Sequence, residues 1–209
     1  WLSLWPKAST GNTSCAGQGI EMKFVPTHIP DVIIIEPRVF GDERGYFMES
    51  FRSDMFVRQV SGVTFVQDNE SMSMRGVLRG LHYQLPPFAQ AKLVRAVSGR
   101  VLDVAVDIRK NSPTFGQHVA VELSGQNKRQ LFIPGGFAHG FVVRSENAVV
   151  QYKVDNWYSP DHERGIAFDD PDLGIDWGLP EEELILSDKD RAHPLLQDAV
   201  VFDFHCISG

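Results

Sequence analysis

Hydrophobic residues in this chain recur in short runs with a two-residue period, separated by turn residues at roughly eight- to twelve-residue spacing from Val32 onward. In the run 118–123, Val119, Val121 and Leu123 share one face of an extended strand. Many such strands with few helical signals between them predict an all-β fold. At this length the economical architecture is a jelly-roll β-barrel with a few short helices.

Two pairs of these runs are predicted to form β-hairpins, because only a short turn segment separates their members. Lys92–Val97 and Val101–Ile108 flank a Ser-Gly-Arg turn, and Gly140–Val143 and Val149–Val154 flank a Ser-Glu-Asn turn. Helical turns are expected in three segments: Ser53–Val60, Pro180–Leu186 and Ser187–Ala192.

We expect a single domain over residues 22–204, because no repeat, linker or low-complexity segment divides it. Residues 1–21 lack hydrophobic periodicity and precede a Met-Lys-Phe sequence that reads as a natural start, so they are expected to be an expression remnant or a disordered tail. Residues 205–209 are expected to be a C-terminal tail of similar kind. Cys15 and Cys206 both fall in these tails, which argues against a disulfide framework and fits a reducing cytoplasm.

Composition excludes two classes of partner. The 209 residues carry a formal net charge of −7, whereas nucleic-acid binding depends on clustered Lys and Arg. The longest apolar runs, such as Val32–Ile35, are far too short to cross a bilayer. Neither a nucleic acid nor a membrane is therefore expected as a partner.

Strand alternation places unusual side chains inside the predicted barrel. Tyr152 shares a face with Val150 and Val154, so its phenol is expected to point inward. Lys92 shares a face with Val94, which is a costly position for an unpaired ammonium group. For Lys92 this position favours a functional role over a purely structural one, whereas Tyr152 could also be an ordinary core tyrosine with a satisfied hydroxyl.

A histidine stands near the end of each of two β-type runs. In the first run, strict alternation places His82 and Arg79 on opposite faces, but a bulge at Gly80 would turn both toward one cavity. The second run follows the sequence Pro134-Gly135-Gly136 and contains His139. The two runs resemble the halves of the cupin signature, except that Gln84 stands where cupins have a second metal-binding His and no Glu follows within reach. Two histidines are too few ligands for a transition metal, so proton transfer without a metal is predicted.

Over residues 22–204 the chain resembles the nucleotide-sugar epimerase branch of the cupins, and within it the dTDP-4-dehydrorhamnose 3,5-epimerases. The resemblance depends on several motifs in a specific order, namely 40–45 (FGDERG), 65–69 (FVQDN), 78–82 (LRGLH), 92–95 (KLVR), 107–109 (DIR), 112–116 (SPTFG), 133–140 (IPGGFAHG), 158–160 (YSP) and 187–190 (SDKD). It implies inversion of C3 and C5 of a dTDP-4-keto-6-deoxy sugar, without a cofactor, by a homodimer.

Inverting a carbon beside a ketone requires a base, an enolate-stabilising group and an acid on the opposite face. His82 suits the base, Lys92 the stabilising group and Tyr152 the acid. The resemblance assigns Asp190 to orient His82, although a 187–190 capping box explains the same carboxylate without any catalytic role.

The resemblance also implies a set of substrate contacts around the diphosphate and the thymine. Two roles are possible for His139: it could donate a hydrogen bond to the ketone or phosphate, or it could anchor its own loop. Arg44 could also be part of a solvated turn, and Tyr158 could pack on Pro160. The predicted substrate-binding residues are Arg44, Phe47, Glu49, Gln67, Asn69, Arg79, His139, Tyr158, Glu163 and Lys189.

Alternative functions remain open at this point. An epimerase acting on C3 or C5 alone, or a ketoisomerase, would share residues like His82 and Lys92, although an inward Tyr152 favours double inversion. A metal-dependent cupin oxygenase is disfavoured by Gln84, and a non-catalytic sugar-binding module leaves the inward polar residues unexplained. The homodimer is expected to form by pairing of a strand around Thr27–Val32 with a second chain.

Overall fold

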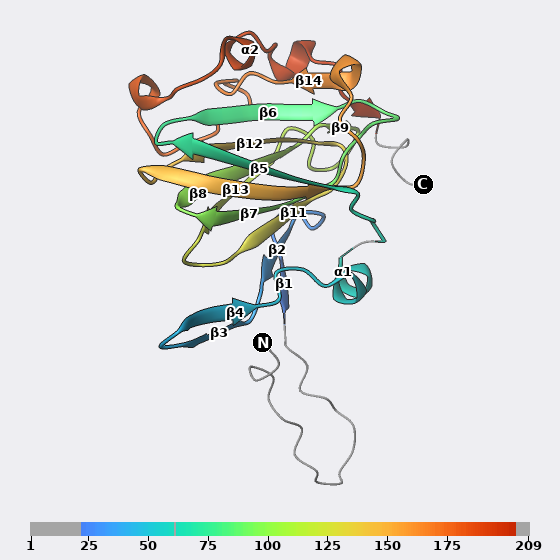
Figure 1. Cartoon of the computed structure of the whole chain (residues 1–209). Coiled ribbons are helices and arrows are strands. Elements are labelled where there is room, and N and C mark those ends of the chain that lie inside the picture. Colours follow the sequence, from blue (N-terminus) through green and yellow to red (C-terminus); the bar gives the residue numbers. More distant parts are fainter. Residues whose placement is uncertain (1–21, 61, 204–209) are drawn as a thin grey trace.

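The computed structural model describes residues 22–60 and 62–203, whose main strands form two packed sheets (Figure 1). In spatial order, the six-stranded sheet contains β1 (Lys23–Pro26), β2 (Ile33–Glu36), β11 (Gln130–Ile133), β7 (Lys92–Ser98), β13 (Asn147–Val154) and β5 (Gln67–Met74). The five-stranded sheet contains β10 (His118–Ser124), β8 (Arg100–Asp107), β12 (Phe137–Val143), β6 (Leu78–Gln84) and β14 (Glu163–Gly165). The predicted all-β, jelly-roll fold with a few short helices is confirmed.

Short elements surround the two sheets. The predicted helix over Ser53–Val60 is confirmed as α1 (Ser53–Gln59). The others are the hairpin β3 (Val39–Asp42) and β4 (Gly45–Met48), the parallel pair β9 (Arg109–Lys110) and β15 (Phe202–Asp203), α2 (Asp188–Arg191), and the 3₁₀ turns η2 (Pro160–His162), η3 (Glu181–Glu183) and η4 (Leu196–Asp198). Among the described residues, no helix is both long and apolar enough to cross a bilayer.

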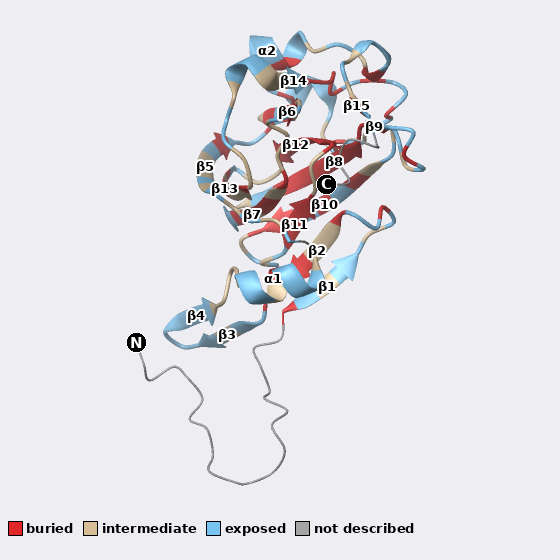
Figure 2. Ribbon diagram, turned by 90° about the vertical axis from the view of Figure 1, so that its right-hand side faces the viewer, coloured by how far each residue is buried: buried red, intermediate tan, exposed pale blue. Residues whose placement is uncertain are grey.

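Strand β8 shows how the core is built, because it is buried on both faces (Figure 2). Its residues Val101 and Ala105 face the six-stranded sheet, whereas Leu102, Val104 and Val106 pack against the C-terminal segment that covers the other face. Strand β10 alternates as predicted, with Val119, Val121 and Leu123 buried. A third apolar cluster, around Phe56 of α1, covers the outer face of the six-stranded sheet.

Both predicted hairpins are wrong. β7 pairs with β11 and β13, whereas β8 pairs with β10 and β12, so the chain crosses from one sheet to the other at Gly99. β12 and β13 likewise belong to different sheets. Gly99 has φ +71°, and a Cβ there would lie 2.1 Å from the carbonyl oxygen of Asn147. Only glycine fits this corner, and a Gly-containing turn between two β runs reads the same in sequence whether the chain returns in one sheet or changes sheets.

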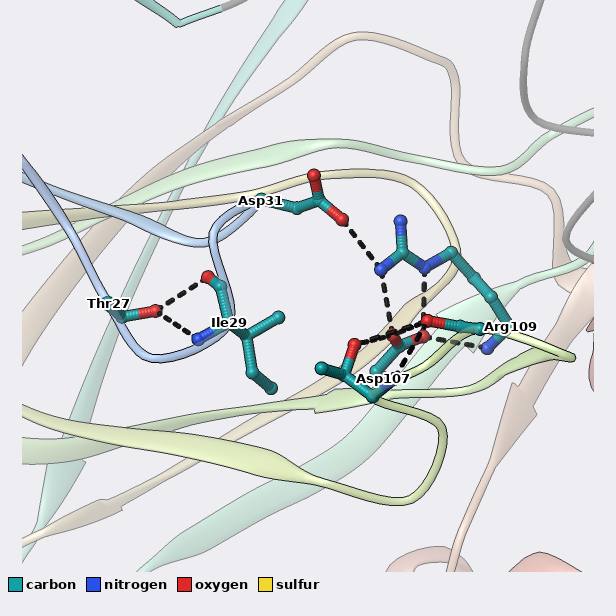
Figure 3. A network of polar contacts seen from close by, with 7 residues as sticks. Thr27, Ile29, Asp31, Asp107 and Arg109 are labelled. Atoms are coloured by element: carbon teal, nitrogen blue, oxygen red, sulfur yellow. Dashed lines mark hydrogen bonds and ion pairs between the residues drawn. The ribbon is translucent and has the colours of Figure 1, made fainter.

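The strand predicted around Thr27–Val32 is also wrong, because this segment is the turn between β1 and β2. Thr27 closes the turn, with its hydroxyl donating to the carbonyl of Ile29 at 2.8 Å, and Ile29 is fully buried. Figure 3 shows Asp31 reaching Arg109 at 2.8 Å, and Arg109 also pairs with the buried Asp107. This network ties the turn to the end of β8.

Candidate active site

A cavity of about 270 Å³ opens between the two sheets and receives side chains from both. The residues that line it are Gln67, Asn69, His82, Tyr83, Gln84, Gln90, Lys92, Tyr152, Tyr158 and Glu163. The predicted base, oxyanion-stabilising group and acid are therefore in one cavity, although they are up to 70 positions apart in the sequence.

A bulge in β6 gives His82 its orientation, as predicted. His82 lies opposite His139 of β12 and Arg79 lies opposite Phe141, so two residues of β6 face one residue of β12. Gly80 permits this because its φ is +144°, and a Cβ there would lie 2.5 Å from the Cα of Gly140. The bulge places Arg79 and His82 on the same face of the strand.

Asp190 holds the far side of the His82 ring. The Nε2 atom of His82 lies 2.5 Å from Oδ1 of Asp190, and Ser187 donates its hydroxyl to Oδ2 at 2.8 Å. Although burial raises the pKa of Asp190, these two hydrogen bonds outweigh it and hold that pKa below its usual value. Because the ionised carboxylate only accepts, Nε2 must carry the proton, and Nδ1 keeps the lone pair that a base needs.

The structure shows the serine half of the expected capping box, whereas the Asp190 carboxylate contacts the Ser187 hydroxyl and His82 and no backbone N–H among the described residues. Ser187 is the N-cap of α2, and its hydroxyl oxygen accepts a hydrogen bond from the backbone N–H of Asp190 at 3.2 Å. The cap thus fixes the start of α2 and also orients the carboxylate that contacts His82. A short helix of four residues is used here to position one side chain.

Lys92 lies among apolar neighbours on the inner face of β7, as predicted, with Val94 and Ala96 buried beside it. Burial lowers the pKa of Lys92 to about 8, against the opposing attraction of Asp103 and Glu163. A lysine with a pKa of about 8 is mostly charged at neutral pH and loses its charge as the pH rises above that value.

The pH dependence of turnover is expected to report this lysine. If the ammonium of Lys92 stabilises an oxyanion, the contribution of Lys92 to the rate is full below a pH of about 8 and is lost as the pH rises through that value. Lys92→Met, which keeps the length of the side chain, should reduce the rate and remove this alkaline fall. A pH–rate profile of both proteins between pH 6 and pH 10 tests the prediction, and an unchanged alkaline fall in Lys92→Met would contradict it.

Tyr152 enters the cavity from β13, opposite the sheet that contributes His82. Its neighbours Val150 and Val154 on the same face are buried, which confirms the predicted inward orientation. Burial raises the pKa of Tyr152, with the positive charge of Arg79 acting in the opposite direction. The phenol therefore keeps its proton at neutral pH, as a general acid must.

His139 lies behind this cavity and not in its lining. It is buried, and its Nε2 atom lies 3.0 Å from both carboxylate oxygens of Asp103, which is itself fully buried. Burial lowers the pKa of His139, although Asp103 opposes the shift. His139 and Asp103 thus form a buried pair beneath Lys92 and His82, whose charges both act on His139.

Several hydrogen-bonded polar side chains lie at the opening of the cavity. Glu163 accepts a hydrogen bond from the hydroxyl of Tyr158 at 2.7 Å and pairs with the ammonium of Lys189 at 2.5 Å. The ring of Tyr158 is 56% exposed and does not pack as a core residue. Across the cavity, the amide of Gln67 donates to the side-chain oxygen of Asn69 at 2.7 Å.

The residues that line the cavity do not include six of the predicted substrate-binding residues: Arg44, Phe47, Glu49, Arg79, His139 and Lys189. Lys189 contacts the cavity wall through Glu163, and the charge of Arg79 acts on Tyr152. Arg44 and Phe47 lie on the β3–β4 hairpin, which projects from the end of the six-stranded sheet (Figure 1) and lines a different hollow. Arg44 pairs with Asp42 of the same turn, as the solvated-turn reading expects. Glu49 follows β4, and its carboxylate lies 3.6 Å from the guanidinium of Arg52.

Comparison with known proteins shows which family this chain belongs to. The sequence model described as dTDP-4-dehydrorhamnose 3,5-epimerase matches residues 26–198. A dTDP-4-dehydrorhamnose 3,5-epimerase from Shigella flexneri is 60% identical over 182 residues, which cover 87% of this chain and 99% of that protein. The chain belongs to the dTDP-4-dehydrorhamnose 3,5-epimerase family.

Solved structures agree with membership of the dTDP-4-dehydrorhamnose 3,5-epimerase family. A dTDP-6-deoxy-D-glucose-3,5-epimerase from Legionella pneumophila in complex with dTDP-4-keto-L-rhamnose is similar with a TM-score of 0.85 and 49% identity, covering 88% of this chain and 98% of that one. A 3'-monoepimerase from Streptomyces bikiniensis in complex with dTDP-quinovose gives a TM-score of 0.80 at 33% identity, covering 87% and 93%. The fold is thus common to double and single epimerases.

Sequence reasoning missed several residues around this epimerase-family site. Gln84 lines the cavity, but its amide is fully used: it donates to the carbonyls of Phe88 and Trp157 and accepts from the N–H of Ser159. Asp103, which pairs with His139, could have been suspected because an acid interrupts a continuous apolar run. His193, which follows α2, lies beside Asp190, with Nε2 3.6 Å from Oδ1 of that carboxylate.

Proposed function

We propose that this chain inverts C3 and C5 of dTDP-4-dehydro-6-deoxy-D-glucose to give dTDP-4-dehydro-L-rhamnose. The observation that carries the proposal is that His82, Lys92 and Tyr152 line one cavity, with His82 and Tyr152 entering from opposite sheets. A base and an acid on opposite sides of a sugar ring are what inversion requires. The high identity to double epimerases supports action at both carbons.

In this mechanism, Nδ1 of His82 removes the proton from the carbon beside the ketone. The C–H electron pair moves into the ring and the ketone oxygen becomes an enolate oxygen, which the ammonium of Lys92 stabilises. Asp190 stabilises the imidazolium that forms on His82, because its carboxylate already accepts from Nε2. Tyr152 then returns a proton to the opposite face of the carbon.

The rim residues are proposed to bind the nucleotide. Tyr158 is exposed beside the cavity and could stack on thymine, while Lys189 and Arg79 supply positive charge for the diphosphate. Gln67, Asn69 and Glu163 offer polar contacts on the cavity wall.

The decisive experiment is incubation with dTDP-4-keto-6-deoxyglucose in heavy water, followed by NMR. Incorporation of deuterium at both C3 and C5, with inversion at both, supports the proposal. Inversion at one carbon only would support the single-epimerase alternative, to which the Streptomyces bikiniensis relative points.

Catalysis is expected to proceed without a metal. Gln84 stands where a cupin ligand would be, and its amide is already used by three backbone groups. Exhaustive chelation should leave the turnover rate unchanged. Loss of activity on chelation, with recovery on addition of a stoichiometric metal, would overturn this prediction.

A homodimer is proposed on grounds other than the strand expected around Thr27–Val32. The outer edges of β1 and β5 have no partner strand among the described residues, and Met72 and Met74 of β5 are exposed. The β3–β4 hairpin, with Tyr46 and Phe47 exposed, also projects from the domain. A second chain would cover these surfaces. Arg44 and Phe47 of the hairpin could then contact substrate in the cavity of that second chain.

Sedimentation at micromolar concentration is expected to give twice the mass of the chain. Met72→Lys and Met74→Lys, placed on the open edge of β5, should shift the protein toward monomer, whereas Val200→Lys, at an exposed apolar position before β15, should not. A monomer for the unaltered protein would refute the dimer. The cytoplasm is proposed as its compartment, on the cysteine content alone.

A further inference from the structure

His193 is a buried imidazole for which the proposed mechanism has no use. It follows α2, and its side chain is only 10% exposed. Its Nε2 atom is one of two buried side-chain polar atoms without a hydrogen-bond partner among the described residues. That atom lies 3.6 Å from Oδ1 of Asp190, the oxygen that also contacts His82.

The fold leaves space for this ring. A Cβ at Gly165 would lie 2.3 Å from Nε2 of His193, so any other residue there would displace the imidazole. Gly165 belongs to β14 and pairs directly with His82 of β6. The rings of His82 and His193 lie 5.5 Å apart, nearly perpendicular. Two imidazoles therefore approach one carboxylate oxygen from different elements.

Two imidazole nitrogens and one carboxylate oxygen are a donor set suited to Zn²⁺ and similar transition metals. The ligand atoms of His82, Asp190 and His193 all lie within 4.8 Å of one another. Zinc bonds of about 2.1 Å place ligand atoms roughly 3.4 Å apart. The site therefore forms when His82 and Asp190, whose contacting atoms are 2.5 Å apart, separate by about 0.9 Å and His193 moves toward them.

We propose that His82, Asp190 and His193 form a site for Zn²⁺ or a similar divalent transition metal, which inhibits the enzyme when it binds. The inhibitory part rests on the proposed function, in which His82 is the base. The site differs from the cupin signature, because two of its three ligands come from the C-terminal segment around α2.

Inhibition follows from the chemistry of one imidazole. A metal on Nε2 of His82 takes the place of the proton there, and the neutral ring then carries its proton on Nδ1. The lone pair that would remove the substrate proton is thereby lost. Asp190 becomes a metal ligand at the same time and no longer accepts from His82. Metal binding and catalysis thus exclude each other, which agrees with a reaction that itself needs no metal.

The test compares metal binding and inhibition in matched variants of the full chain without an affinity tag. All proteins carry Cys15→Ser and Cys206→Ser, so that thiolates do not bind the metal. Calorimetry with Zn²⁺ and visible absorption with Co²⁺ measure binding without substrate. The ratio of turnover with and without Zn²⁺ is measured within each variant. His193→Gln removes one ligand, and His28→Gln removes an imidazole on the β1–β2 turn as a control.

The unaltered ligand set is expected to bind one equivalent of metal and to lose turnover reversibly, with recovery on chelation. His193→Gln should weaken both binding and inhibition by roughly 10- to 100-fold or more, since even outer partners of metal ligands contribute that much. His28→Gln should change neither. Asp190→Asn is a second binding variant in case His193→Gln unfolds at lower temperature.

Equal Zn²⁺ affinity in His193→Gln and in the cysteine-free protein with all three ligands overturns the proposal. The absence of binding in the latter protein also overturns it. Lower turnover in His193→Gln without any metal effect would mean that His193 only positions Asp190. Should the chain fail to exchange substrate protons in heavy water, the proposed function fails, while the Co²⁺ spectrum still decides whether the site exists.

Discussion

His82→Asn is expected to abolish turnover while nucleotide binding stays close to that of the unaltered protein. The base acts only in the proton-transfer step, so its loss should reduce the rate by about 10²- to 10⁴-fold without removing a contact to the nucleotide. Asparagine retains a polar side chain near Asp190, which limits the cost of leaving that carboxylate without a donor. Turnover is measured by NMR and dTDP affinity by calorimetry.

Two further variants make the His82 result specific. His28→Asn changes an exposed imidazole that contacts the backbone carbonyl of His118, and it should leave turnover unchanged. Asp190→Asn keeps the Ser187 cap geometry but replaces the charged acceptor of His82, so it should slow the same step. Deuterium exchange at both carbons at the normal rate in His82→Asn would remove His82 from the mechanism. Loss of thermal stability alone in Asp190→Asn would leave Asp190 only its capping role.

The fold class was predictable because side-chain alternation directly reports which face of a strand is buried. The buried face of β10 and the inward orientation of Lys92 and Tyr152 followed from period-two spacing alone. Strand pairing was not predictable in the same way. The turn at Gly99 joins two sheets, and its need for glycine comes from the backbone of Asn147, which lies 48 positions away. No local pattern carries that information.

The residues of the candidate site were also predictable only where a local sequence pattern marks them. His82 and the Gly80 bulge could be recognised locally, since a glycine two positions before a histidine is visible in the sequence. The contact between His82 and Asp190 spans 108 positions, and only the family resemblance suggested it. His193 could not be found by either route, because its significance depends on an unpaired nitrogen and on the space that Gly165 leaves.

Tyr152→Phe is expected to separate proton exchange from inversion. The substitution keeps the ring and its packing beside Val150 and Val154, so the free energy of unfolding should change little. His82 and Lys92 remain, so the enolate still forms on the side of the base. Without the phenol, proton return to the opposite face is impaired, and the enolate is reprotonated by His82 instead. The variant should therefore incorporate deuterium with retention of configuration and yield little inverted sugar.

Tyr83→Phe is the matched control: Tyr83 contributes to the cavity lining, but its side chain packs in the apolar cluster with Leu81 and Phe202, and its hydroxyl donates to the carbonyl of Val200. It should affect stability slightly and inversion not at all. NMR in heavy water measures exchange and configuration at C3 and C5 in both variants. A parallel fall of exchange and inversion in Tyr152→Phe would assign Tyr152 to deprotonation or to binding. Inversion at the full rate would mean that water or another group returns the proton. Burial raises the pKa of Tyr152 and makes the phenol a suitable acid, but water in the cavity can also donate a proton.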